Sequence, residues 1–470
     1  MSNPNIVYIF FDDLGYGDIS YLNPESKIQT PNIDRLSAEG MCFTDVHSCS
    51  AVCSPSRYGV LTGRYCWRTR LQNGVLNGYS DPLIEPERLT VASLLKQHGY
   101  HTACIGKWHV GLNWTRKKGV QRLENYRLGW DRGEAIDFTQ PFTGGPCDLG
   151  FDYFYGISAS LDMPPYVYLE NNRTICEPTA HAPRGLFGRE GHAAPGLKPE
   201  HVIPDLTKKA VSFIEETAAD KQPFFLYYPV TGPHTPIAPN KAFTGKSQAG
   251  KYGDFVVECD WAVGQIMDAV EKIGATDNTL FIVTSDNGPE RFMHARKQEY
   301  NHYSAYHFRG CKRDNWEGGH RIPFIARWPE KVAAGSFSDE IVCLTDLIAT
   351  AADIIGHTLP ENASEDSCSI LPVLTSQNAT SLREATVHHS SKGEFAIRQG
   401  KWKLLLHQSS GGNDYPDDPI DDAPSQLYDM ETGYRERENL YAQHPEIVSR
   451  LTDLLNQYKT RGRSVPMEKA

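Results

Sequence analysis

The sequence lacks the features that mark several large classes of protein. No apolar run is long enough to cross a bilayer, which argues against a membrane span. Positive charge is in the minority, because 58 aspartates and glutamates outnumber 47 lysines and arginines and leave a formal net charge of −11. Nucleic acids and anionic membranes are bound by basic surfaces, so neither is an expected partner.

Cysteine pairs at metal-finger or redox spacing are also missing. The 11 cysteines are scattered along the chain, which leaves their redox state open. The residues before the first expected strand contain no charged segment followed by an apolar one, so we expect no signal peptide within this chain. For the mature protein we favour a periplasmic or secreted location.

What the chain does contain is a repeated pattern of strand-length apolar runs, each followed by polar residues. Such runs cover residues 6–11, 224–228 and 280–284. They are typical of strands buried on both faces of a parallel sheet. Helix start and stop signals lie between them, at residues 30–40, 90–99 and 345–356. The pattern predicts an α/β fold, in which ligands bind at the carboxyl ends of the strands.

The pattern changes beyond about residue 375. Short strands are expected at residues 385–389, 395–398 and 402–407, and a loop at residues 409–424. A terminal helix is expected after Pro445, with one apolar stripe formed by Ile447, Leu451, Leu454, Leu455 and Tyr458. A chain of 470 residues is also long for one core. We therefore predict a catalytic domain at residues 1–375 and, at 376–470, a smaller α+β subdomain with an antiparallel sheet and a packed helix.

Two pairs of oxygen-bearing residues follow predicted strands. Asp12 and Asp13 follow the first apolar run, and Asp286 and Asn287 follow the third. Either pair alone is weak evidence, since Asn287-Gly288 is also a common turn signal. Together they supply four oxygen ligands, which suit a hard cation such as Ca²⁺ or Mg²⁺ better than zinc.

One short stretch combines a cysteine with helix-start and anion-binding features. It consists of Cys53-Ser54-Pro55-Ser56-Arg57 followed by Leu61-Thr62-Gly63-Arg64. A free cysteine is most often a buried small hydrophobe. Here we expect Ser56 to cap a helix with Arg57 in its first turn, where backbone N–H groups and the helix dipole favour an anion.

Three further motifs carry lysine or histidine. They are Gly106-Lys107-Trp108-His109-Val110-Gly111, Pro233-His234-Thr235-Pro236, and Phe308-Arg309-Gly310-Cys311-Lys312-Arg313 before Trp316-Glu317-Gly318-Gly319. In an extended chain Lys107 and His109 would point to the same side. Alone, each of these side chains could be a solvated lysine or a structural histidine.

Taken in order, these motifs resemble the type I, formylglycine-dependent sulfatases over roughly residues 5–330. The resemblance implies an alkaline-phosphatase-like fold, with a large mixed and mostly parallel sheet sandwiched by helices. It implies one Ca²⁺, with Mg²⁺ less expected, held by Asp12, Asp13, Asp286 and Asn287. It also implies that a maturation enzyme oxidises Cys53 to formylglycine (3-oxoalanine).

The resemblance further implies how the catalytic residues act. One hydroxyl of the formylglycine hydrate attacks sulfur, and the other later expels sulfate. The charge on the sulfuryl oxygens is balanced by the metal, Arg57, Lys107 and Lys312. His234 protonates the departing sugar oxygen, and His109 takes the proton that releases sulfate.

For the substrate we expect a sulfated saccharide, with exo-acting removal of a galactose or N-acetylgalactosamine 6-sulfate as the first hypothesis. Expected sugar contacts are Ser160, Asp162, His320 and Arg321. A formylglycine-dependent phosphonate or phosphodiester hydrolase is the alternative enzyme. The alternative of another class is a catalytically silent protein that binds sulfated glycan.

Overall fold

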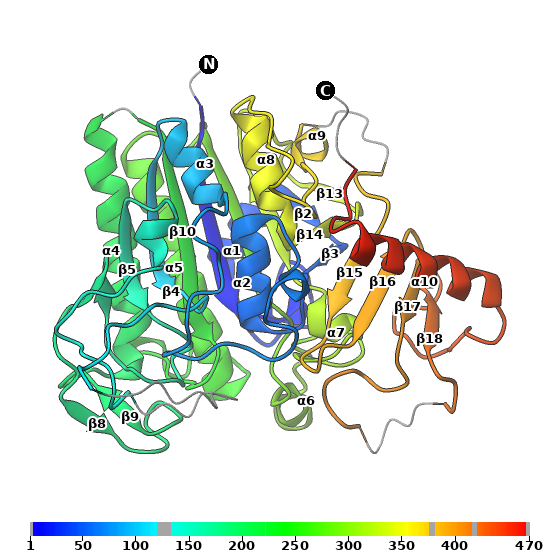
Figure 1. The fold of residues 1–470 in the computed structure, drawn as a ribbon, viewed down its shortest axis with the longest axis horizontal. Helices are drawn as coiled ribbons and strands as arrows, with labels where there is room; N and C mark the ends of the chain where they lie inside the picture. Colours follow the sequence, from blue (N-terminus) through cyan, green and yellow to red (C-terminus); the bar gives the residue numbers. More distant parts are fainter. Residues whose placement is uncertain (1–2, 120–132, 221, 376–380, 416–420, 467–470) are drawn as a thin grey trace.

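A ten-stranded mixed sheet runs through the centre of the molecule (Figure 1). The structure is a computed structural model that describes residues 3–119, 133–220, 222–375, 381–415 and 421–466. The strand order is β13-β2-β12-β11-β1-β10-β4-β5-β6-β7. In that order the strands are Ser336–Ser338, Met41–Phe43, Phe324–Arg327, Thr279–Ser285, Asn5–Asp12, Phe224–Pro233, His101–Lys107, Tyr153–Ile157, Leu169–Glu170 and Arg173–Thr174.

The five middle strands, from β11 to β5, are parallel. Every residue of β10 and β11 is buried, as are all residues of β1 except its first. The three apolar runs are therefore strands covered on both faces, as predicted. All three carboxyl ends lie at the same edge of the sheet, which brings the polar residues that follow them together.

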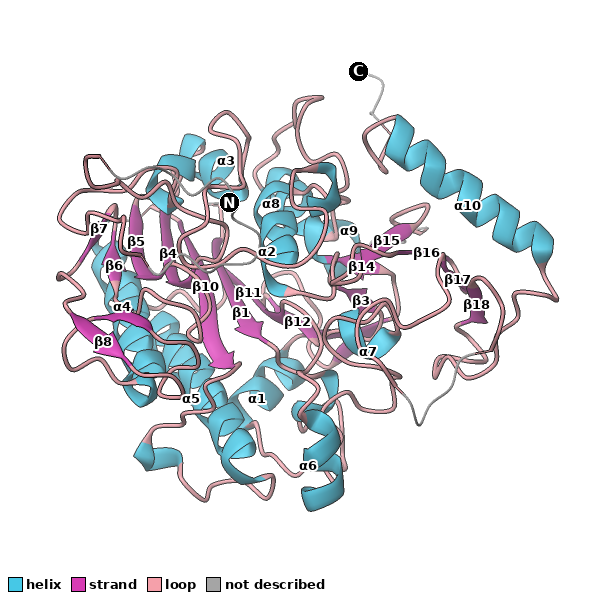
Figure 2. Ribbon diagram, turned by 60° about the horizontal axis from the view of Figure 1, so that its bottom comes forward, coloured by secondary structure: helices cyan, strands magenta, loops and turns pink. Residues whose placement is uncertain are grey.

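Helices cover both faces of the sheet (Figure 2). Alternate β1 side chains pack into opposite cores, with Val7 and Ile9 on one side and Tyr8 and Phe10 on the other. The first core is covered by α1 (Pro31–Glu39), α4 (Val202–Thr217) and α5 (Gly250–Lys272). The second is covered by α2 (Cys53–Thr62), α3 (Val91–Gln97) and α8 (Leu347–Ile354). The predicted α/β class is confirmed, and no helix within the described residues is long and apolar enough to cross a membrane.

A four-stranded antiparallel sheet and the terminal helix form the C-terminal part. Three of its strands match the predicted ones, whereas β18, the fourth, was not predicted. The strands β15 to β18 are Thr386–His389, Phe395–Gln399, Trp402–Leu405 and Gln426–Asp429, and α10 is Pro445–Thr460. The helix buries Leu451, Leu454, Leu455 and Tyr458, as expected from its stripe. The domain boundary after residue 375 stays a prediction, since residues 376–380 lie outside the described part, as do residues 416–420 of the predicted loop.

Shorter elements connect these layers. They are β3 (Val46–His47), β8 (Ala180–Ala182), β9 (Gly191–Ala193), β14 (Val342–Cys343), α6 (Met293–Tyr300), α7 (Glu317–His320) and α9 (Leu371–Leu374).

A buried histidine cluster, formed by His47, His320 and His388, joins the central part to the C-terminal sheet. His47 Nδ1 and His320 Nδ1 lie 3.0 Å apart, and the rings of His320 and His388 stack with their centroids 3.9 Å apart. Lys403 of β17 donates to Glu317 of α7 at 2.8 Å beside them. Burial lowers the pKa of all three histidines, so the folded protein holds them neutral.

We predict that stability falls on acidification and that His388 contributes to the fall. In the unfolded chain these histidines have a pKa near 6.5, so they take up protons at a pH where the folded protein keeps them neutral. The stabilisation is thus complete above about pH 6.5 and is lost as pH decreases, by about 1.4 kcal/mol per pH unit for each histidine. Thermal unfolding midpoints from pH 7.5 to 5.5 measure this loss.

His388→Phe should lower the pH dependence, because it removes one titrating ring and keeps a similar shape. His181→Phe, at an exposed position, is the matched control and should leave the dependence as in the parent. An unaltered dependence in His388→Phe would contradict the assignment.

Candidate active site

Three carboxylates meet at the carboxyl ends of β1 and β11. Asp12 ends β1, and Asp286 follows β11 and donates its backbone N–H to the carbonyl of Phe11 at 3.0 Å. Asp13 has a positive φ of 67°, a turn that aims its backbone N–H at Asp286 Oδ1, 3.2 Å away. All three side chains are almost completely buried, at 0–2% exposure.

Three cations from different elements balance these carboxylates. Lys107 at the end of β4 reaches Asp12 Oδ2 at 2.6 Å, and Arg57 of α2 reaches Asp286 Oδ2 at 2.8 Å. Lys312 reaches Asp13 Oδ1 at 2.6 Å. The residues far apart in sequence that we predicted to share a site are therefore in direct contact.

The carboxylates respond differently to this environment. Burial works to raise the pKa of Asp12, but Lys107 and the other nearby cations outweigh burial and hold that pKa well below its usual range. Burial and the charge on Asp12 raise the pKa of Asp286 to about 6, despite the nearby Arg57. Negative charge at Asp286 is thus less well compensated than that at Asp12, which favours binding of a further cation there.

Helix α2 begins at Cys53, four residues earlier than predicted. The N-cap is Val52, and the Ser56 hydroxyl donates to the carbonyl of Ser50 at 2.9 Å, so Ser56 is not the cap. Pro55 fits in the first turn, where its missing N–H removes no helix bond, and this allows the earlier start. Cys53 therefore occupies the first helical position, at the end that favours anions.

The Cys53 thiol faces the carboxylates from a closed position. Its Sγ lies 3.5 Å from Asp12 Oδ1, and the residue is 3% exposed. Burial raises the pKa of the Cys53 thiol to about 12, although Lys107 and Lys312 act in the opposite direction. The unmodified side chain is thus a neutral thiol near pH 7, and the thiol form is a weak nucleophile.

His109 is held in one protonation state. It adopts a positive φ of 57°, so the extended chain that we expected from Lys107 to His109 ends before it. Its Nε2 lies 2.8 Å from the carbonyl of Leu76, which can only accept, and therefore Nε2 carries a proton. Burial and the charges on Lys107 and Arg57 keep its pKa well below the usual range. The remaining nitrogen, Nδ1, is buried and has no hydrogen-bond partner within the described residues, so its lone pair is available.

His234 approaches the carboxylates at Asp13. Its Nδ1 lies 2.6 Å from the carbonyl of Thr235 and 3.1 Å from Ser160 Oγ, which places a proton on Nδ1. Its Nε2 lies 3.7 Å from Asp13 Oδ2. A second proton on this ring would sit on Nε2 and face the site, which suits a general acid.

Asn287 offers an oxygen that no group in the described part of the chain uses. Its Nδ2 donates to Asp13 Oδ1 at 2.7 Å, whereas its Oδ1 is buried and has no hydrogen-bond partner within the described residues. One amide oxygen and three carboxylates form a hard, all-oxygen donor set, which fits Ca²⁺ or Mg²⁺. The predicted metal ligands therefore fit such an ion.

The four expected sugar contacts separate into two groups. Ser160 touches His234, and Asp162, which pairs with Arg189 at 3.1 Å, follows Ser160 by two residues. His320, at 0% exposure, belongs to the histidine cluster, and Arg321 donates to Glu317 and to the carbonyl of Thr44 at 2.9 Å each. The expectation for His320 and Arg321 is corrected, because internal partners use their polar atoms at the junction with the C-terminal sheet.

Two contacts that shape the site had no sequence motif. The carbonyl of Leu76, which orients His109, comes from an irregular loop and carries no recognisable signal. The second is the pair formed by Arg313 and Glu290, two bonds at 2.7 and 2.8 Å beside Lys312. Arg313 directly follows Lys312 in the sequence, but its partner Glu290 lies more than twenty positions away, so the sequence does not predict the pair.

Comparison with known proteins agrees with this geometry. A family model described as Sulfatase matches residues 4–357, and one described as N-sulphoglucosamine sulphohydrolase, C-terminal, matches residues 307–461. The chain is 34% identical to N-acetylgalactosamine-6-O-sulfatase of Bacteroides thetaiotaomicron, over 97% of this chain and 93% of that protein. It is 33% identical to human arylsulfatase A, over 96% of this chain and 87% of that protein.

The fold comparison gives the same family. A solved structure, titled as part of the metabolism of multiple glycosaminoglycans by Bacteroides thetaiotaomicron, superposes with a TM-score of 0.84. It is 33% identical and covers 98% of this chain and 100% of its own. The sulfatase family model alone spans well over half of the chain. The chain therefore belongs to the sulfatase family and is a sulfuric ester hydrolase.

Proposed function

We propose that the chain removes the 6-sulfate from a terminal N-acetylgalactosamine or galactose residue of a sulfated glycan. The observation that carries the reaction type is the meeting of Cys53 with three carboxylates and three cations in one buried site. The choice of sugar is supported by the 34% identity with a bacterial N-acetylgalactosamine-6-O-sulfatase over nearly the whole chain.

We infer that Cys53 acts only after a maturation enzyme has oxidised it to formylglycine. The aldehyde hydrate supplies one hydroxyl for attack on sulfur and a second for expulsion of sulfate, whereas a thiol would leave a covalent product that needs another attack. The neutral, buried state of the Cys53 thiol is compatible with a precursor.

The cations are placed to hold the sulfate group. Arg57, Lys107 and Lys312 neutralise the three carboxylates in the absence of a metal, so the group as a whole has no net charge. A divalent cation held by Asp12, Asp13, Asp286 and Asn287 would supply two further positive charges. That surplus suits the developing charge on the sulfuryl oxygens.

The two histidines differ in the proton that each can move. His109 presents an unprotonated Nδ1, so it accepts the proton whose removal releases sulfate. His234 keeps one proton on Nδ1 and can deliver another from Nε2 to the departing sugar oxygen. The proposed base and the proposed acid thus differ in their hydrogen-bond partners and in the nitrogen that each leaves for the reaction.

A panel of monosaccharide sulfates tests the proposed substrate. We expect the highest kcat/KM for N-acetylgalactosamine or galactose 6-sulfate, because transition-state binding is optimised for the correct sulfate position. The panel carries sulfate at each hydroxyl in turn, with an aryl phosphonate as the control for a phosphonate hydrolase. Preference for another position, or for the phosphonate, would contradict the proposal.

Replacement of the nucleophile precursor tests the formylglycine step. Cys53→Ala should lose at least about 10³-fold in kcat, because removal of a covalent nucleophile removes the pathway. Cys66→Ala is the matched control, since both cysteines are 3% exposed. Intact mass of the parent from a maturation-competent host should be lower by about 18 Da, the loss on converting the thiol to an aldehyde. An active preparation of unchanged mass would defeat the inference.

Metal removal should lower both activity and stability. Chelation leaves the Asp286 carboxylate without its extra cation, and the thermal midpoint should fall and recover on addition of Ca²⁺. At a Ca²⁺ concentration of 100 times Kd, the stabilisation is about 2.7 kcal/mol. The doubly changed Asp12→Asn, Asp13→Asn protein should show no Ca²⁺-dependent shift. A full shift in that variant would place the ion elsewhere.

A further inference from the structure

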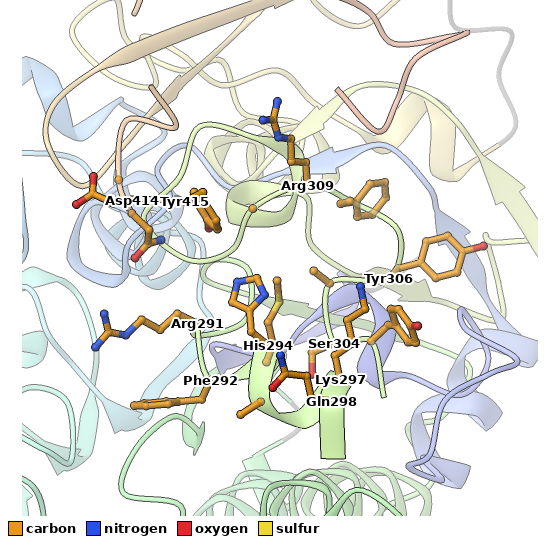
Figure 3. A pocket seen from close by; sticks show the side chains of 18 of the residues that line it. Arg291, Phe292, His294, Lys297, Gln298, Ser304, Tyr306, Arg309, Asp414 and Tyr415 are labelled. Atoms are coloured by element: carbon orange, nitrogen blue, oxygen red, sulfur yellow. The ribbon is translucent and has the colours of Figure 1, made fainter. Parts of the chain in front are cut away.

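A large cavity lies between α6 and two loops, outside the group of catalytic residues. Its volume is about 920 Å³, within the range of pockets that enclose drug-sized ligands. In Figure 3 His294 and Lys297 project from α6, and Arg309 and Tyr415 come from the facing loops.

The cavity shares two walls with the active site. The loop after β11 carries Asn287 and reaches the cavity four residues later, at Arg291. Gly310 lines the cavity two residues before Lys312. Asn413, also in the lining, donates from Nδ2 to the carbonyl of Lys312 at 2.9 Å. The cavity therefore adjoins the segment that carries Lys312.

The lining has the opposite charge to the protein. It contains five arginine or lysine side chains and one carboxylate, Asp414, although the chain as a whole has a formal charge of −11. Within the described residues, no hydrogen bond or ion pair involves the guanidinium of Arg291, and Lys297 Nζ lies 4.9 Å from the ring centroid of Tyr303. Cations gathered in an acidic protein indicate an anionic ligand.

Aromatic side chains give the cavity a second property. Five of them line it, and Phe292 at its rim is 52% exposed. Flat aromatic faces beside cations suit a sugar ring that carries a negative group.

We propose that this cavity binds the next sugar of the glycan through its carboxylate or sulfate, with Arg291 and Lys297 as the principal anion contacts. This proposal rests on the proposed function, because it extends the substrate from the sulfated terminal residue to its neighbour. Specificity for an acidic glycan would then come from a site separate from the sulfate-binding residues.

Four substrates that share the same 6-sulfated N-acetylgalactosamine test the proposal. They are the monosaccharide and three disaccharides in which the second sugar is a neutral hexose, a uronate or a sulfated hexose. The parent should prefer the anionic disaccharides over the neutral one by about tenfold in kcat/KM, the effect of one good charge-assisted contact. Comparison of the uronate disaccharide with the sulfated-hexose disaccharide shows whether the cavity prefers a carboxylate or a sulfate. Preference should decline as salt is added.

Variants test the two cations directly. Arg291→Ala combined with Lys297→Ala should abolish the tenfold preference, and the charge-retaining pair Arg291→Lys with Lys297→Arg should keep most of it. The matched control is Lys208→Ala with Arg450→Ala, on the exposed surfaces of α4 and α10. A parent without preference, or a doubly substituted alanine variant that keeps it, overturns the proposal.

Binding to the Cys53→Ala protein separates this proposal from the proposed function. Failure of the parent to hydrolyse any of the four sugars would reject the proposed function alone. Calorimetry of the same sugars with the Cys53→Ala protein would then still test whether the cavity binds the second sugar. Weaker binding of the anionic disaccharides after Arg291→Ala and Lys297→Ala are added supports the proposal. Equal binding of the neutral and anionic disaccharides to Cys53→Ala rejects it.

Discussion

Confinement of three carboxylates at adjoining strand ends is the constraint on which the site depends. Buried like charges repel one another strongly in a medium of low polarisability, so they persist only with opposite charges in contact. Lys107, Arg57 and Lys312 supply those charges from three separate elements. Under the proposed function, the same balance would let the site accept a divalent cation together with the negatively charged sulfate group of a substrate.

The C-terminal sheet helps to place the proposed catalytic groups, although none of those groups lies in its described strands. The carbonyl of His389, at the end of β15, accepts hydrogen bonds from Ser50 Oγ and from the backbone N–H of Ala51, both at 2.9 Å. The backbone N–H of Arg313 in turn donates to the carbonyl of Ala51 at 2.8 Å. Hydrogen bonds thus connect the residues just before Cys53 both to β15 and to the segment that carries Lys312.

The parts that sequence predicts best are those with a local physical signature. Strands β1, β10 and β11 were recognisable because burial on both faces demands continuous apolar residues. The ten proposed catalytic and metal positions could be named because they lie in short motifs, and their roles stay predictions. The predicted start of α2 was wrong because its N-cap, Val52, has no side chain that can cap a helix and so gives no sequence signal. Pro55 is compatible with the first turn, but it does not mark where that turn begins. His320 was misassigned because the sequence next to a motif does not show whether a histidine contacts a ligand or stacks on another buried ring. The cavity near Arg291 was missed because its walls come from segments over a hundred residues apart.

The closed position of Cys53 determines when it can be changed chemically. The Cys53 side chain is 3% exposed and contacts Asp12, so another protein has almost no access to it in the folded state. The oxidising enzyme of the proposed maturation step would therefore have to meet this residue while the polypeptide around it is still extended, before α2 docks on the sheet. Under that proposal, maturation and folding compete in time. A chain that folds too quickly would keep its thiol, so kinetics and not the stability of the finished protein would set the yield of active molecules.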